Sequence, residues 1–369
     1  MQNQSAPVLI FAQSGRFLAQ SATQAGYRVW VADCFGDVDT KASCERWQVL
    51  PALSTLTKQQ FLTIIENISQ GETCNLIYGS GIEQCYPFLN SLPPHIKLLG
   101  NSFACIEQIK TPQFFFSLLD DLHLPYPATT FTRDEVEQNY IAKSATGLGG
   151  HHIQNAEQAL SYHNYYFQKR ITGNSGSLLF LANGHSSYTL SINKQFLDPT
   201  PESPYRLGML QSPWKISTHH ERTLLSACDQ IIKKAKLTGL NSLDFIISND
   251  GLLFILEINP RPSASAELLR TMHPTLIQQH IDACNGVLPG APITKPDKTR
   301  SLRYIYANND FLIPANMSWP IECNDLTAAG NIIKKNEPIC SCLVEAIDHK
   351  HALQQLSKIE LAICNQLEA

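Results

Sequence analysis

The first hundred residues alternate short apolar runs with stretches of helical spacing. Residues 8–12 (VLIFA) and 28–32 (RVWVA) are apolar, and residues 17–25 between them have the spacing of an amphipathic helix that ends at Gly26. Residues 76–78 form another apolar run, which is closed by a glycine-rich turn. Strands that alternate with a helix in this way predict a parallel α/β sheet.

Three turns follow these predicted strands, at residues 14–16, 37–39 and 79–83. Because ligands of open α/β sheets bind at the carboxyl ends of the strands, we expect these turns to lie on one rim. The candidate substrate-binding residues there are Gly15, Arg16, Gly79, Ser80 and Glu83. Ordinary glycine turns without a ligand are the alternative. The first turn has a single glycine, which does not fit the dinucleotide fingerprint and argues against NAD.

A glycine-rich loop follows a predicted strand in the sequence YIAKSATGLGGHH, residues 140–152. Lys143 lies in the strand, and Gly147, Gly149 and Gly150 lie in the loop. Glycines let backbone N–H groups approach phosphate oxygens closely, and the lysine adds positive charge. No Gly-Lys-Ser/Thr follows, so the loop is not a P-loop, and an ordinary turn stays an alternative. We interpret His151 and His152, which end the loop, as residues without a chemical role, and metal ligation is the alternative.

Other segments complete the predicted framework of the central region. Residues 102–122 have helical spacing with Pro112 near one end, and two prolines that follow suggest a linker. Residues 164–171 (NYYFQKRI) predict a strand, and residues 267–284 predict a helix that is interrupted at Pro274.

The apolar segment at residues 243–262 (LDFIISNDGLLFILEINPRP) contains a strong hairpin signal, Asp250-Gly251. If these two residues form the turn, counting back along the two strands sets Asp244 directly opposite Glu257. Two opposed carboxylates repel each other and destabilise the strand pair. A longer turn would shift the register, so this geometry depends on the turn length.

A divalent cation would remove the repulsion between Asp244 and Glu257. Asn259 lies two residues beyond Glu257 and therefore points to the same face. Three hard oxygen ligands with few carboxylates suit Mg²⁺, which keeps waters and nucleotide oxygens as its other ligands. Arg261 follows and could meet a phosphate or a developing oxyanion. The alternative is a strand whose acidic residues face water.

Residues 288–297 are rich in proline and polar residues, which indicates a second boundary. Beyond it we expect strands at residues 302–307 and 339–346 and a terminal helix at 353–367. We therefore predict three domains: an N-terminal α/β domain at 1–100, a central domain at 101–290 with a lid at about 125–165, and a small α+β domain at 291–369.

The composition narrows the classes of function. The chain has 369 residues, of which 43% are hydrophobic and 16% charged, and its net charge of −4 argues against nucleic acid and anionic membranes as partners. No apolar stretch reaches the roughly 18 residues of a membrane helix, and the N-terminus lacks a basic region typical of a signal peptide. Eleven scattered cysteines without a CxxC pair predict reduced core thiols in a cytoplasmic protein and argue against a zinc site.

Taken in order along the chain, Lys110, Lys143 with its glycine loop, residues 168–171, Asp244 and the Glu257-x-Asn259 motif resemble the ATP-grasp superfamily. Members include biotin carboxylase and D-alanine–D-alanine ligase. The resemblance covers about residues 110–288, and the first hundred residues fit the Rossmann-like α/β domain that usually precedes it. The stretches EINPRPSAS, GSGIE and PICS resemble more narrowly the predicted ATP-dependent carboligases related to biotin carboxylase. This group includes enzymes that join glutamate to amines in the biosynthesis of one-carbon carriers, cofactors of the tetrahydromethanopterin and methanofuran type.

This resemblance implies roles for individual residues. Lys110 and Lys143 would contact the ATP phosphates under the glycine loop, and Arg261 would steady an acyl-phosphate and a tetrahedral intermediate. Asp244, Glu257 and Asn259 would bind one or two Mg²⁺ ions, with Mn²⁺ as an alternative ion. The implied adenine and ribose contacts are Gln168 and the backbone groups of Lys169 and Ile171. The family more commonly has glutamate at the positions of Gln168 and Asp244. The glutamine at position 168 weakens the implied ribose contact.

The resemblance implies an ATP-dependent carboxylate–amine ligase that acts through an acyl-phosphate and releases ADP. Its partners would be a small carboxylate and an amine, and relatives suggest a homodimer. Two alternatives stay open. One is a carboxylase acting through carboxyphosphate, although no Met-Lys-Met context for biotin is present. The other is a nucleotide-binding regulatory protein without catalysis, against which the intact Glu257, Asn259 and Arg261 argue.

Overall fold

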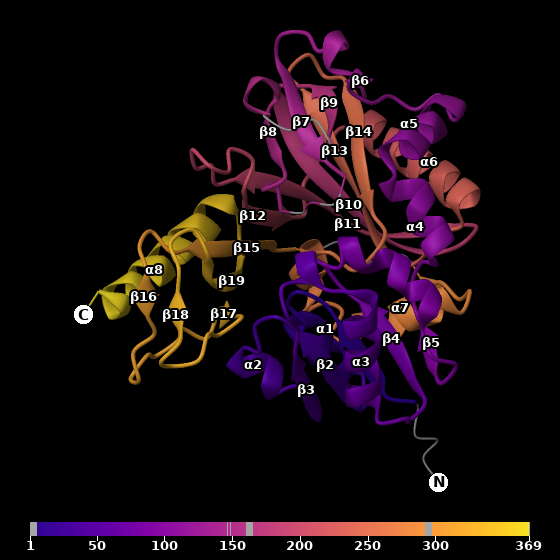
Figure 1. Cartoon of the computed structure of the whole chain (residues 1–369). Coiled ribbons are helices and arrows are strands. Elements are labelled where there is room, and N and C mark those ends of the chain that lie inside the picture. The colour runs from indigo at the N-terminus through magenta and orange to yellow at the C-terminus, as the bar shows by residue number, and fades with distance from the viewer. Residues whose placement is uncertain (1–5, 146, 148, 160–164, 292–296, 369) are drawn as a thin grey trace.

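The structure is a computed structural model that describes residues 6–145, 147, 149–159, 165–291 and 297–368 (Figure 1). The strands form four sheets: five strands near the N-terminus, four in the region expected to be a lid, eight in the centre and two near the C-terminus. No helix among the described residues is long and apolar enough to cross a membrane.

The N-terminal sheet is parallel throughout, as the alternation of apolar runs predicted. Its strand order is β3-β2-β1-β4-β5, with β1 at Val8–Phe11, β2 at Val29–Asp33, β3 at Arg46–Val49, β4 at Cys74–Tyr78 and β5 at Ile96–Leu98. One face packs against α3 (Lys58–Ser69), and the other packs against α1 (Arg16–Gln24) and the distant α7 (Leu276–Cys284). Short helices border this sheet: α2 at Val38–Lys41, η1 at Leu53–Thr55 and η2 at Glu83–Ser91.

The helix expected at residues 102–122 is two helices, α4 (Phe103–Lys110) and α5 (Pro112–Asp121). Thr111 between them has φ −82° and ψ 113°, because the ring of a following proline disfavours the helical conformation. Pro112 is instead well placed as the first residue of the next helix, where its missing N–H costs nothing. The break leaves Lys110 at the end of α4, close to the central sheet.

A small antiparallel sheet occupies the region expected to form the lid. Its order is β6-β9-β7-β8, with β6 at Thr129–Thr130, β7 at Tyr140–Ser144, β8 at Ile153–Asn155 and β9 at Tyr165–Lys169. Two short helices, η3 (Arg133–Glu135) and η4 (Ala156–Gln158), flank it. Its buried core consists of three alanines and one phenylalanine, Ala142, Ala156, Ala159 and Phe167.

The central sheet has eight strands in the order β14-β13-β10-β11-β12-β15-β19-β17. The strands are β10 (Gly173–Asn183), β11 (Ser187–Leu197), β12 (Leu207–Ser212), β13 (Thr238–Ser248), β14 (Leu253–Asn259), β15 (Thr299–Tyr306), β17 (Cys323–Asn324) and β19 (Pro338–Ala346). Residues of α4, α5 and α6 (Thr218–Ala235) pack on one face of β10, β13 and β14. The helix expected at 267–284 is split into η5 (Ala264–Leu269) and α7, and both pack against the other face.

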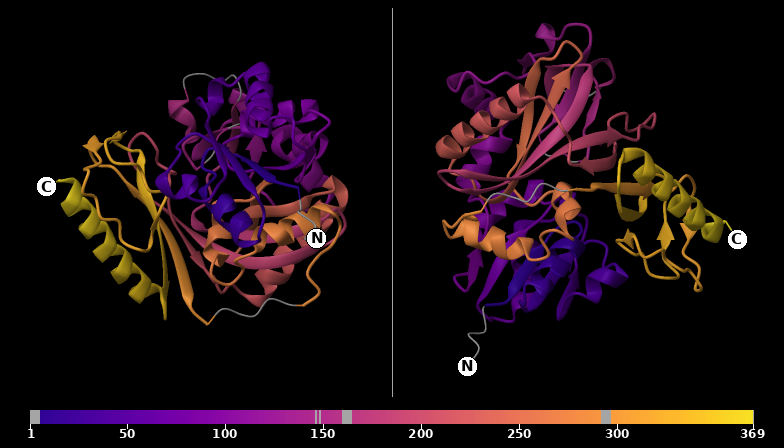
Figure 2. Two further views of the ribbon diagram at one scale, coloured as in Figure 1. Left: turned by 90° about the horizontal axis from the view of Figure 1, so that it is seen from below. Right: turned by 180° about the vertical axis from the view of Figure 1, so that it is seen from behind.

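The C-terminal segment does not build a sheet of its own from its long strands. Strands β15 and β19 extend the central sheet, and α8 (His349–Leu367) packs against them (Figure 2). Strands β16 (Phe311–Leu312) and β18 (Ile332–Ile333) form a separate two-stranded sheet beside them. This segment contacts the N-terminal region, because the backbone N–H groups of Asp325 and Leu326 donate to the Asp39 carboxylate on α2.

Candidate active site

The β13–β14 hairpin places its two carboxylates opposite each other, but by a different route from the one predicted. The turn has three residues, 249–251, because Ser248 pairs with Leu252 through both its backbone N–H and its hydroxyl. The expected two-residue turn is therefore wrong. A bulge at Leu256 adds one residue to β14, which restores the register, so Asp244 lies opposite Glu257.

The acidic face of the hairpin is held together by an amide. The Asn259 Nδ2 donates to Asp244 Oδ2 at 3.1 Å and to Glu257 Oε1 at 3.5 Å, so all three side chains point to one face. Burial and the charge of Glu257 raise the pKa of Asp244 to about 8. Burial acts on Glu257 in the same sense, but Lys110 and other nearby cations outweigh it and lower its pKa. Without a metal ion, Asp244 therefore holds a proton more readily than a free carboxyl group does.

This arrangement fits a divalent cation. Two carboxylates at one point of a sheet repel each other unless a positive charge lies between them, and here an N–H donor takes that place. Asp244, Glu257 and Asn259 supply the hard oxygens that Mg²⁺ prefers. Asn259 would present Oδ1 to an ion after its amide rotates, since Oδ1 now accepts from Arg261 Nη2 at 3.3 Å. The Gln195 side chain, which sequence reasoning missed, contacts Asp244 Oδ1 at 3.4 Å.

Two lysines reach this face from different elements. Lys110 Nζ lies 3.1 Å from Glu257 Oε2, and its side chain is 13% exposed. Lys143 on β7 is buried, and its Nζ donates to Gln168 Oε1 at 2.8 Å. Burial lowers the pKa of Lys143, although Glu257 and Asp244 act in the opposite direction. The structure thus places Lys110 in contact with Glu257, and it places Lys143 where both carboxylates influence its charge.

The glycine loop is closely packed at its base. Gly149 and Gly150 have φ of +63° and +83°, and a Cβ on Gly150 would lie 1.8 Å from the Tyr205 carbonyl oxygen. The Leu207 N–H donates to the Gly149 carbonyl at 3.1 Å. A Cβ on Gly147 would lie 1.9 Å from His152 Cβ. Residues 146 and 148 of this loop lie outside the described residues.

Gln168 and Lys169, which were expected to contact adenine and ribose, have hydrogen-bond partners within the protein. Gln168 is buried, and its Nε2 donates to Thr129 Oγ1 at 3.0 Å while its Oε1 accepts from Lys143. The Lys169 N–H donates to the Ala128 carbonyl at 2.8 Å, so this N–H is already paired. Ile171 lies half-buried between β9 and β10. Gln168 therefore orients Lys143 in this structure.

Arg261 and Glu83 form a buried pair beside the hairpin. The Arg261 Nε and Nη2 donate to Glu83 Oε1 at 3.0 and 2.9 Å, and each side chain is less than 10% exposed. Burial acts against the charge of Arg261, but Glu83 outweighs it and raises the arginine pKa. The structure therefore assigns Glu83 to the orientation of Arg261, whereas the sequence suggested direct substrate contact.

Two glycine-turn residues near β1 also have structural partners. Arg16 donates to Glu267 at 2.6 and 2.7 Å and to Asp325 at 3.0 and 3.0 Å, and it is 2% exposed. It therefore links α1 to η5 and to the segment after β17, which the sequence did not indicate. Gly15 allows close approach of its turn to β2, since a Cβ there would lie 2.5 Å from Val31 Cγ1.

A pocket of about 680 Å³ lies between the N-terminal rim and the C-terminal segment. Gly79 and Ser80 line it, together with residues 262–264 just after Arg261, so the expected rim does face a cavity. Within the described part of the chain, its lining has one basic residue, Arg16, and four acidic residues, namely Asp37, Glu267, Asp325 and Glu337. A second pocket of about 600 Å³ adjoins Lys110 and Glu83 and includes several aromatic residues, Tyr86, Phe103, Phe131, Tyr165 and Tyr166.

The central region is similar to a known protein domain. Residues 113–265, less than half of the chain, are similar to the ATP-grasp domain. No curated protein matches the sequence.

Solved structures share the fold over nearly the whole chain. Biotin carboxylase from Campylobacter jejuni, solved as a β-γ-ATP complex, has a TM-score of 0.76 at 12% identity, with coverage of 97% of this chain and 92% of its own. The biotin carboxylase domain of 2-oxoglutarate carboxylase from Hydrogenobacter thermophilus, solved with MgADP and bicarbonate, has a TM-score of 0.75 at 11% identity, covering 96% and 90%. L-amino acid ligase from Bacillus licheniformis has a TM-score of 0.73 at 12% identity, covering 97% and 98%. These likenesses confirm a parallel α/β sheet followed by an ATP-grasp fold.

Proposed function

We propose that this protein is an ATP-dependent carboxylate–amine ligase that forms an amide through an acyl-phosphate. The observation that carries the proposal is the convergence of Lys110 and Lys143 on the opposed pair Asp244 and Glu257. Cations and carboxylates in such an array suit a phosphoryl group bound with a metal, where catalysis rests on position and charge.

The phosphate end of the site is built from groups that can change partner. Lys110 now neutralises Glu257, and in the proposed complex its Nζ turns to a phosphate oxygen. Lys143 is held by Gln168, and the charges of Glu257 and Asp244 act on it. Mg²⁺ held by Asp244, Glu257 and Asn259 would neutralise the phosphate oxygens, and Mn²⁺ has similar ligand preferences. Backbone N–H groups of the glycine loop would cover the phosphates and exclude water.

The proposed reaction has two steps. A substrate carboxylate oxygen attacks the γ-phosphorus of ATP, so a new P–O bond forms, the bond to the β-phosphate bridging oxygen breaks, and ADP leaves. An amine then attacks the acyl carbon, phosphate leaves, and the nitrogen loses a proton as the amide forms. Arg261, held by Glu83, supplies a fixed positive charge for the oxyanion of this second step.

The acid-lined pocket supports an amine as the acceptor. A cavity with four carboxylates and one guanidinium attracts an ammonium group, and its wall continues directly from Arg261. Burial and neighbouring acids raise the pKa of Asp37 to about 7, so this carboxylate is suited to accept the proton that the ammonium must lose. We propose an amino acid such as glutamate as the carboxylate substrate and the amine of a cofactor precursor as the acceptor.

The test is a coupled ADP-release screen of amino acids, beginning with glutamate, against a panel of amines in the presence of Mg²⁺. We expect ADP release that requires both a carboxylate and an amine. Glu257→Gln should abolish turnover, whereas Asp250→Asn, the same kind of change in the exposed turn of the hairpin, should keep it.

Other outcomes of this screen would overturn the proposal. ADP release that requires bicarbonate and no amine would indicate a carboxylase acting through carboxyphosphate. ATP binding without ADP release from any pair of substrates would indicate a regulatory nucleotide-binding protein. Activity that survives in Glu257→Gln would show that the opposed carboxylates do not hold the catalytic metal.

A further inference from the structure

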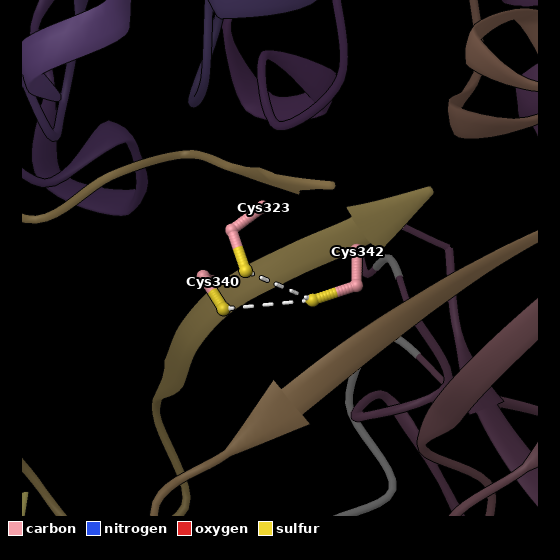
Figure 3. A group of neighbouring side chains, drawn as sticks. All are labelled: Cys323, Cys340 and Cys342. Atoms are coloured by element: carbon pink, nitrogen blue, oxygen red, sulfur yellow. Dashed lines mark hydrogen bonds between the residues drawn. The ribbon is translucent and has the colours of Figure 1, made fainter. Parts of the chain in front are cut away.

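Three cysteines of the C-terminal segment converge in the buried core, away from the hairpin site. Cys340 and Cys342 lie two residues apart on β19 and point to one face of that strand, and Cys323 on β17 pairs with Cys342 (Figure 3). Their residues are 1%, 0% and 6% exposed, respectively. All eleven cysteines of the chain are free thiols, and these three come together although they lack the close CxxC spacing typical of zinc sites.

The distances between the sulfur atoms suit ligands of one ion. The Sγ of Cys342 lies 3.4 Å from that of Cys323 and 3.9 Å from that of Cys340, and all three lie within 4.8 Å of one another. A Zn–S bond of about 2.3 Å with tetrahedral angles separates two ligand sulfurs by about 3.8 Å. Small side-chain rotations would therefore bring the three thiols into a coordination shell.

The surroundings favour a soft ion over a hard one. The cluster lies in an apolar core with Ile305, Ile333 and Val344, where an oxygen-preferring ion would find no partner among these side chains. Thiolates select Zn²⁺ and Cu⁺. With three thiolates, Zn²⁺ leaves a net charge of −1 and Cu⁺ leaves −2, so zinc costs less to bury in this setting.

We propose that Cys323, Cys340 and Cys342 bind one thiophilic d¹⁰ cation, with zinc as the better fit. Each thiol loses its proton to solvent as its sulfur binds the metal. Cys340 also belongs to the lining of the 680 Å³ pocket, so a fourth ligand such as water would reach the ion from that pocket. This inference does not depend on the ligase reaction.

The position of the cluster gives the ion a structural task. Cys323 lies two residues before Asp325, whose carboxylate holds Arg16 and accepts from Ser341 on β19. The strand β17 that carries Cys323 is only two residues long. A bond from the metal to β17 and β19 would therefore fix the short strand and the acidic wall of the pocket.

The test measures metal in the full-length chain, purified under reducing conditions from zinc-containing medium, by inductively coupled plasma mass spectrometry. We expect about one zinc per chain in the wild type, and its loss in Cys340→Ser and Cys342→Ser. Cys228→Ser is the matched control. Cys228 is equally buried, but it lies in α6, which packs on the face of β10, β13 and β14 and not in the C-terminal segment. Glu257→Gln should keep the zinc, which separates this site from the hairpin.

A second readout works on the wild type alone, in case a serine variant fails to fold. Apo protein titrated with Co²⁺ should develop thiolate-to-cobalt charge-transfer absorption, and Zn²⁺ should displace it and raise Tm. Copper in place of zinc would support the thiolate site and change the resident ion. No bound metal and no uptake of Zn²⁺ or Cu⁺, a Cys323–Cys342 disulfide in the purified protein, or equal metal content in Cys340→Ser and the wild type would each overturn the proposal.

Discussion

Arg16 offers the sharpest test of how the three parts of the chain are held together. Arg16→Met keeps most of the side-chain volume and removes the guanidinium, which leaves Glu267 and Asp325 without their main partner. Burial alone would raise the pKa of Asp325, but Arg16 outweighs it and holds that pKa below its usual range. Removing one partner of a buried ion pair costs about 3–5 kcal/mol, because the remaining charge stays buried.

The expected loss can be measured as a shift in Tm. Unfolding entropy is about 2.1 cal/mol/K per residue, so the 369 residues give about 0.8 kcal/mol/K if they unfold together, and Tm should fall by about 4–6 °C. Differential scanning calorimetry of Arg16→Met and the wild type measures this shift.

Arg28→Met is the matched control for this experiment. Arg28 pairs with Glu45 and Glu72 on the same domain, but its side chain is 38% exposed, so we expect a change within the error of the measurement. If Arg16→Met instead leaves Tm unchanged and raises KM for a carboxylate substrate, Arg16 binds substrate as the sequence suggested, and the interpretation of Arg16 as a structural link is wrong.

Three further predictions concern pH, metal and nucleotide. Burial lowers the pKa of His280 from 6.5 to about 4, so the neutral side chain stabilises the fold fully above pH 6.5, and this contribution is lost as the pH falls towards 4. Between pH 7 and 4, the unfolding free energy of the wild type should therefore drop by about 3 kcal/mol more than that of His280→Phe. An equal drop in the two proteins would contradict this prediction. Because the pKa of Asp244 is raised, Mg²⁺ binding at pH 7 should release nearly one proton, as calorimetry in two buffers would detect, and Asp244→Asn should release less. Gly150→Ala should weaken ATP binding at least about fivefold, since its Cβ would meet the Tyr205 carbonyl and strain costs about 1–3 kcal/mol. Gly71→Ala, at φ +77° with open space around it, should leave ATP binding unchanged.

Local patterns in the sequence were sufficient for much of the fold and for the chemistry of the hairpin. Short apolar runs identified the parallel strands near the N-terminus and the two strands of the hairpin at residues 243–262. Such runs are visible in the sequence because the burial of a strand depends on residues that are close along the chain. The opposition of Asp244 and Glu257 followed from a hairpin signal, although the three-residue turn and the bulge at Leu256 offset each other in a way that the sequence does not reveal. The break at Thr111 was also encoded locally, in the proline that follows it.

Long-range contacts decided the rest. Arg16 and Glu267 are 251 positions apart, so no spacing rule could pair them, and the same holds for Arg261 with Glu83 at 178. The three clustered cysteines come from two strands whose pairing was invisible along the chain, and β15 and β19 could have formed their own sheet. The sequence by itself determined which residues can form strands, helices, a glycine loop and an acidic hairpin, since these depend on near neighbours. Only the tertiary structure decided which charges and thiols meet, because buried groups find partners through the packing of the whole chain.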